Sequence, residues 1–235
     1  MLALARPGVA AASAIALAAA GLSGSASAST GVRLVGHQTH TVTGSGVHAV
    51  ERVRTVVTGV TGVSAVVSRR VAADLDRRTA KFVVPPRGQD GPFDLEDKLV
   101  LAHADARYVT VNQDTYYYSG GAHGESANLP LTYSATTGKL LTVRSFAAKG
   151  KLASLLKVLS VQSRKVLAAQ GITADFFKYG TTPTYVNFED FEPLPTGWRV
   201  EFPQGDVADE AHGPLHVTVP WSALKGLIAL PLPTA

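Results

Sequence analysis

The pattern of hydrophobic and polar positions predicts strands first and then an amphipathic helix. Residues 29–62 are rich in valine, threonine and glycine, and polar and apolar residues alternate from Arg52 to Val57. Such a pattern is typical of one or two strands with flexible turns. Apolar residues then recur at every fourth position with charged residues between them, so we expect a helix that ends near Ala80. These apolar residues are Val63, Val67, Val71 and Leu75.

A second strand-rich block follows a predicted loop. The loop, residues 82–94, contains three prolines and two glycines, which interrupt regular structure. Apolar and polar residues alternate in Lys98–His103 and in Arg107–Val111, and each run predicts a strand. Tyr116–Tyr118 then lead into a group of glycines.

The last part of the chain combines hairpins with a second helix. Residues 128–143 look like a hairpin with its turn at Thr137-Gly138-Lys139. Leucines and valines in residues 152–167 form a helical stripe. Gly171 is a plausible end of that helix. A further hairpin is expected around Pro195-Thr196-Gly197.

Residues 215–228 predict a strand followed by a short helical turn. Strands therefore outnumber helices, and hairpin connections outnumber crossovers. We expect an α+β fold in which a largely antiparallel sheet packs with two main helices. Residues 29–235 are expected to form a single domain, because no internal repeat or linker interrupts residues 29–228.

The first 28 residues are typical of a secretory signal peptide. Arg6 supplies a positive charge, residues 9–22 form an alanine-rich apolar run, and Ala26–Ala28 offer the small residues that a signal peptidase needs. The apolar run is shorter than the roughly 20 residues of a membrane-spanning helix. We therefore expect cleavage after Ala28, a secreted protein located outside the cell or in the cell wall, and no transmembrane anchor in the mature chain.

Composition excludes several classes of function. The chain has no cysteine, so neither disulfides nor thiolate metal sites hold it together, and the hydrophobic core must do so. It carries 22 Lys+Arg against 18 Asp+Glu, a net charge of +4. That balance is too weak and too dispersed for a nucleic-acid-binding protein. No feature calls for a cofactor, and the oligomeric state stays open.

The candidate site with the most chemistry is "TYYYSGGAHGES", residues 115–126, which we call the corner. Gly120 and Gly121 permit backbone conformations that other residues take only at a cost, so the chain can turn sharply here. One interpretation is a strand-to-strand turn in which His123 bonds to buried main-chain carbonyls. A second is a binding surface with aromatic anchors. Its contact residues would be Tyr117, Tyr118, Gly120, Gly121, His123 and Gly124.

A third interpretation of the corner is catalytic. Ser119 would be the nucleophile, His123 the base and Glu125 the residue that orients the base. Strand alternation would point some of these side chains apart. The mature chain also lacks the Gly-x-Ser-x-Gly sequence of the common hydrolases.

Two further clusters are weaker candidates. His212 and His216 are four residues apart, but Gly213 and Pro214 between them oppose a helix, so we expect no metal site. The dense acidic cluster comprises Glu189, Asp190 and Glu192, interleaved with Phe188 and Phe191. We interpret this cluster as the solvated edge of a hairpin, with a contact for a basic partner as the alternative. A glycosidase would need a second carboxylate about 5 to 9 Å away, for which Glu125 is the candidate.

The order of these elements resembles a known family. The strand Arg107–Val111, the segment "YYYSGGAHG", a strand ending in "TGKLLTV", a helix, the hairpin "VNFEDFE…GWRVEF" and the closing "HGPLHVTVPWSAL" follow one another. This series is similar to the extracellular domain of RsiV-type anti-sigma factors. A secreted immunogenic mycobacterial antigen and accessory domains of peptidoglycan deacetylases belong to the same family. The resemblance covers residues 99–228, although Arg144-Ser145-Phe146 replaces the family's usual acidic-leucine-phenylalanine step.

The resemblance implies a cell-envelope or extracellular setting, and in the anti-sigma branch this domain binds lysozyme. We expect neither the transmembrane signalling of that branch nor the catalysis of the deacetylases. The sequence thus predicts a non-enzymatic binding module that recognises a muramidase-like protein or a wall glycan. The alternative is a secreted hydrolase that acts on esters or glycans through Ser119, His123 and Glu125.

Overall fold

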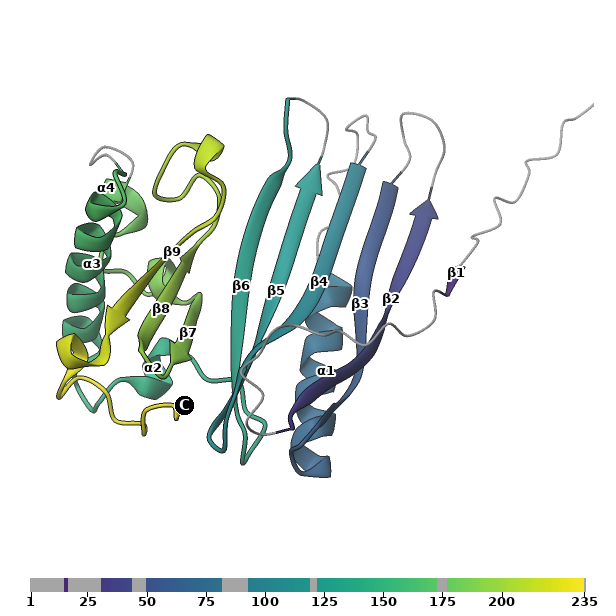
Figure 1. The fold of residues 1–235 in the computed structure, drawn as a ribbon, viewed down its shortest axis with the longest axis horizontal. Helices are drawn as coiled ribbons and strands as arrows, with labels where there is room; N and C mark the ends of the chain where they lie inside the picture. The colour runs from purple at the N-terminus through teal and green to yellow at the C-terminus, as the bar shows by residue number, and fades with distance from the viewer. Residues whose placement is uncertain are drawn as a thin grey trace, which may run out of the picture.

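The computed structural model describes residues 15–16, 31–43, 50–81, 93–118, 122–172 and 177–234. The chain forms two units, each a sheet with a helix (Figure 1). The first unit is a six-stranded sheet in the order β1-β2-β3-β4-β5-β6. Its elements are β1 (Ile15–Ala16), β2 (Arg33–Thr43), β3 (Val50–Thr61), α1 (Ala65–Lys81), β4 (Phe93–Ala104), β5 (Tyr108–Tyr118) and β6 (Glu125–Ser134).

The second unit is a three-stranded antiparallel sheet in the order β7-β8-β9. Figure 1 shows this sheet between the long helix α3 and strand β6. Its elements are α2 (Val143–Phe146), α3 (Leu152–Ala169), α4 (Phe177–Gly180), β7 (Phe191–Leu194), β8 (Gly197–Phe202) and β9 (Leu215–Pro220), with short 3₁₀ helices η2 (Val186–Phe188), η3 (Glu210–His212) and η4 (Trp221–Leu224).

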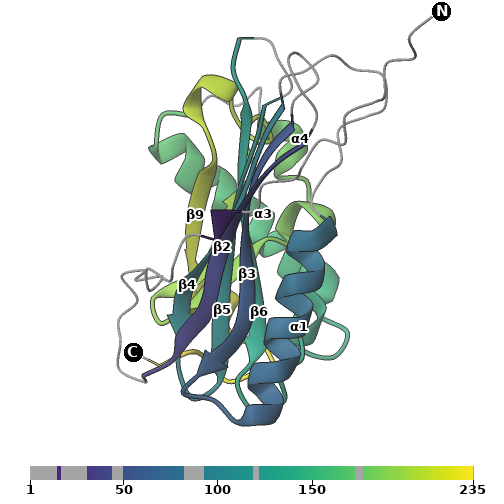
Figure 2. The ribbon, with the colours of Figure 1, turned by 90° about the vertical axis from the view of Figure 1, so that its right-hand side faces the viewer.

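Each unit has its own hydrophobic core. In the first, the apolar stripe of α1 (Val67, Val71 and Leu75) packs against one face of the sheet, and Figure 2 shows α1 on that side. In the second, the Trp198 ring stacks on Phe191 with centroids 4.2 Å apart. Fully burying one such apolar side chain contributes about 1.5–3 kcal/mol. Neighbouring strands are antiparallel except β3 and β4, which are parallel because α1 carries the chain back across the sheet.

The predicted fold class is confirmed: the protein is α+β, its sheets are mostly antiparallel, and each sheet carries one of the two main helices. The predicted 128–143 hairpin is shorter than expected, since after its turn the chain pairs back only at an antiparallel bridge between Tyr133 and Leu140 and does not continue as a strand. The chain starts α2 instead. The Thr142 N–H donates to the Ser145 hydroxyl at 3.1 Å, and Phe146 is fully buried.

The amino-terminal segment is described only at β1. Ile15 pairs with His40 and Ala16 with Thr39, so this segment lies antiparallel to β2. The remainder of residues 1–30 lies outside the described residues, and the signal peptide stays a prediction. Within the described ranges, no helix combines the length and the hydropathy needed to cross a membrane.

Candidate functional site

The three tyrosines of the corner divide between the two faces of the first sheet. In the β4–β5 register, Tyr118 pairs with Asp94, Tyr117 with Leu95 and Tyr116 with Glu96. Side chains alternate along a strand, so Tyr116 and Tyr118 share one face with these carboxylates. Tyr117 shares the opposite face with Leu95, which is buried on the side of α1. The two outer tyrosines therefore lie among acidic side chains.

On the face opposite α1, we call the end that carries Tyr116 and Tyr118 the outer face. It consists of cross-strand rows, because the same register continues through β2, β3, β4 and β5. The first row contains Val42, Glu51, Asp94 and Tyr118; the second contains His40, Val53, Glu96 and Tyr116; the third contains Lys98 and Asp114.

The outer face is acidic and open to solvent. The rows contain four carboxylates (Glu51, Asp94, Glu96 and Asp114) but only one lysine and one histidine. The whole chain, in contrast, has a net charge of +4. His40 Nε2 lies 2.6 Å from Glu51 Oε1, and Lys98 pairs with Glu96. The side chains of Glu51 and Glu96 nevertheless stay 52% and 40% exposed. Negative charge is thus concentrated on this face.

A hollow of about 170 Å³ lies within the outer face, lined by residues of both tyrosine rows. Its walls include Glu51, Asp94 and Glu96, and the Tyr116 ring closes one side. The position of that ring depends on Gly124, because a Cβ at residue 124 would lie 2.5 Å from Tyr116 Cε2. Glycine is needed here for close approach.

The corner is fixed to the second unit by polar contacts. His123 Nε2 lies 3.2 Å from Glu210 Oε2, and both side chains are more than half exposed. The Ser126 N–H donates to Gln204 Oε1 at 3.0 Å, and the Gln204 N–H donates to the Ser126 carbonyl at 3.1 Å. The Gln204 amide also donates to the Glu210 carbonyl at 3.0 Å. The loop after β8 therefore holds the end of the outer face in place.

The predicted corner residues separate into those the structure places and those it does not. Ser119, Gly120 and Gly121 lie outside the described residues. Glu125 pairs with Tyr117 across β5 and β6, on the side of α1. The His123 ring contacts Glu210. The catalytic set of Ser119, His123 and Glu125 stays a prediction.

A buried charge cluster on β7 and β8 was missed by sequence reasoning. Glu192 and Glu201 are only 1% and 4% exposed, so the interpretation of a solvated hairpin edge is wrong for Glu192. Arg199 pairs across the strands with Glu192, and its Nε lies 2.7 Å from Glu201 Oε1. Burial raises the pKa of Glu201 to about 7, although the nearby Arg199 lowers it. The predicted turn at 195–197 would have placed Glu192 opposite Val200, whereas the observed pairing of Leu194 with Gly197 places Glu192 opposite Arg199.

The other residues of the acidic cluster occupy different surroundings. Glu189 is exposed, whereas burial and the negative charges of Glu189 and Asp206 raise the pKa of Asp190 to about 7. His212 lies in η3 and His216 in β9. In the part of the chain that the structure describes, no three histidine or acidic side chains are grouped so that they would hold a metal ion.

Comparison with known proteins identifies the fold. No protein-family model and no curated protein matches the chain. A DUF3298 family protein from Pseudomonas aeruginosa PAO1 is similar in structure, with a TM-score of 0.65, 12% sequence identity, and coverage of 84% of this chain and 94% of that one. A DUF3298 family member from Bacteroides fragilis NCTC 9343 gives a TM-score of 0.58 at 13% identity, covering 86% and 95%. The chain thus has the fold of these DUF3298 family proteins.

Proposed function

We propose that this protein is an extracellular, non-enzymatic binding module that recognises a basic protein surface through its outer face. The observation that carries the proposal is the gathering of four carboxylates and two tyrosines on one face of a chain whose net charge is positive. The fold supports it, because DUF3298 proteins share this architecture and the RsiV-type domains that the sequence resembles are extracellular. A muramidase-like protein with a basic surface is the expected partner.

Charge and rigidity both favour binding at this face. Complementary charges raise the rate of encounter and disfavour wrong partners. Tyrosine supplies a large contact area at little cost in side-chain entropy, and it is enriched among the residues that dominate interfaces. Because Tyr116 and Tyr118 both stand on β5, an inner strand of a formed sheet, the surface needs little ordering on binding.

In this proposal the corner would hold the Tyr116 ring in position. His123 and Glu210 form an exposed polar contact, and exposed contacts of this kind contribute only about 0–1 kcal/mol even when both groups are charged. Together with the two bonds between Ser126 and Gln204, the pair supports the position of Gly124 and hence of the Tyr116 ring. We propose no catalytic role for these residues.

Titration calorimetry of the exported protein with lysozyme tests the proposal. The expected result is saturable binding that weakens as ionic strength rises, since salt screens exposed charges over about 10 Å at 0.1 M. Soluble wall-glycan fragments serve as the second titrant. If only the glycan binds, and salt has no effect on that binding, the result would contradict a protein partner and would indicate a wall polymer instead.

A further inference from the structure

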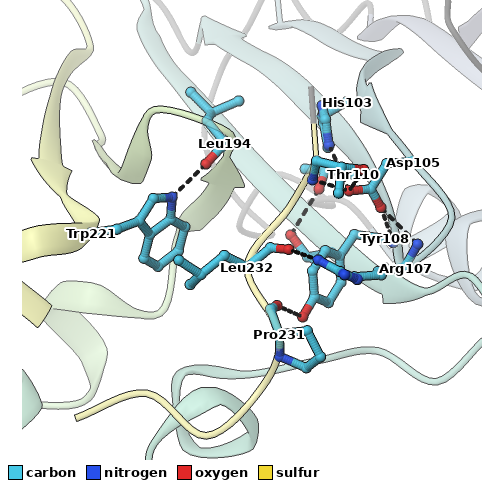
Figure 3. A network of polar contacts seen from close by, with 11 residues as sticks. His103, Asp105, Arg107, Tyr108, Thr110, Leu194, Trp221, Pro231 and Leu232 are labelled. Carbon is cyan, nitrogen blue, oxygen red and sulfur yellow. Dashed lines mark hydrogen bonds and ion pairs between the residues drawn. The ribbon is translucent and has the colours of Figure 1, made fainter. Parts of the chain in front are cut away.

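Residues 229–234, which we call the strap, cross from the second unit to the β4–β5 hairpin of the first (Figure 3). Polar contacts hold the strap along its length, and most of them use the hairpin residues Asp105, Arg107 and Tyr108. They run from Ala229 N–H to the Phe146 carbonyl, from the Tyr108 hydroxyl to the Pro231 carbonyl, from the Arg107 guanidinium to the Leu232 carbonyl, and from Thr234 N–H to Asp105 Oδ2.

A hollow of about 400 Å³ lies between η4 and the strap. Small-molecule sites in proteins typically measure about 300–1,000 Å³, so this hollow has the size of such a site. Apolar side chains form most of its wall. They are Trp221, Leu224, Ile228, Leu230, Pro231 and Leu232.

Three polar groups of the wall are already bonded within the protein. Trp221 Nε1 donates to the Leu194 carbonyl at 2.8 Å, and the Pro231 and Leu232 carbonyls accept from Tyr108 and Arg107; Figure 3 shows these contacts. A ligand inside the hollow would therefore meet apolar walls. An apolar chain gains free energy there because it leaves water without losing hydrogen bonds.

The rim differs from the interior in having a charge. Lys225 is the one charged residue among those that line the hollow, and it is exposed. An ammonium group at the mouth of an apolar hollow is complementary to a molecule with an anionic head and an apolar tail. The head keeps contact with water, so little desolvation opposes the pairing.

We propose that this hollow binds a free fatty acid, with the acyl chain against Trp221 and the strap and the carboxylate beside Lys225. The site lies on the second unit, and it is independent of the outer face and of the binding function proposed for it.

Calorimetric titration of the full chain with octanoate, decanoate and dodecanoate, each below its micelle concentration, tests the proposal. Burying a methylene contributes up to about fourfold in affinity, so the dissociation constant should fall at each step until the hollow is full. Quenching of Trp221 by a brominated fatty acid should accompany binding. Absence of binding, or affinity independent of chain length, overturns the proposal.

Two variants and two further titrants locate the site and define its head-group preference. Lys225→Gln should weaken dodecanoate binding several-fold, whereas Lys157→Gln, at an exposed position of α3, should not. Leu232→Ser should also weaken it, and Val161→Ser is the matched control because Leu232 and Val161 are 41% and 44% exposed. Dodecyl maltoside and dodecyltrimethylammonium should bind less well than dodecanoate. Equal binding of all three amphiphiles, or equal effects of a variant and its control, would contradict the proposal.

Discussion

The ring of Tyr116 lies directly against the backbone of Gly124, where a Cβ would be 2.5 Å from Tyr116 Cε2. This approach fixes one wall of the acidic hollow. The identity of residue 124 thus determines the position of an aromatic side chain eight residues earlier.

Gly124→Ala should destabilise the protein by about 1–3 kcal/mol, because the added methyl group overpacks against the ring. In a Tyr116→Ala background the same change should cost far less, since the clashing ring is gone. Urea unfolding of the four proteins in this double-mutant cycle measures the difference. Equal costs in both backgrounds would show that the ring does not depend on Gly124.

Arg199→Met should destabilise the protein by about 3–5 kcal/mol, because it leaves Glu192 and Glu201 buried without their cation. The exposed Arg144→Met is the matched control and should change stability by less than about 0.5 kcal/mol. The loss for Arg199→Met should shrink at pH 5, because burial raises the pKa of both carboxyls, that of Glu201 to about 7, and protonation removes the buried charge. A loss that is the same at pH 5 and pH 8 would argue against an electrostatic cause.

The free energy of unfolding should fall as pH rises from about 4.5 to 7. In the folded protein, burial raises the pKa of Glu201 from 4.5 to about 7, so in this window the folded state binds more protons than the unfolded state. Stability then decreases with pH, by up to about 3 kcal/mol for this group. The raised pKa values of Asp97, about 6, and Asp190, about 7, act in the same direction.

Glu201→Gln should flatten part of that decline, because glutamine does not ionise. Chemical unfolding at pH 5, 6, 7 and 8 measures the slope, and the exposed Glu125→Gln serves as the control. A slope that Glu201→Gln leaves unchanged would assign the pH dependence to other groups.

Local periodicity was sufficient to predict the two main helices and the fold class. The stripe Val67, Val71 and Leu75 recurs at helical spacing, and it packs on the sheet as expected. The prediction of a full strand at residues 139–143 failed, because the apolar residues of this segment fit a strand equally well. The capping bond between Thr142 and Ser145 favours α2 there instead.

The outer face was not predictable in the same way. Glu51, Asp94 and Tyr116 come from three different strands. Of these, β3 and β4 are neighbouring parallel strands that are connected in the chain through α1. Only the register between strands brings these residues together, and a single sequence does not contain that register. The buried ion pairs of Arg199 were missed for a related reason, since charged residues in a short hairpin are usually exposed.

Binding of lysozyme by the Asp94→Asn, Glu96→Gln double variant tests the central claim most directly. At a single salt concentration, calorimetry should show an affinity at least tenfold lower than that of the unmodified chain, a loss of about 1.4 kcal/mol in binding free energy. The control is Glu189→Gln, which removes an exposed carboxylate outside the outer face. It should leave the affinity unchanged. Undiminished binding by a correctly folded double variant would contradict recognition through the outer face.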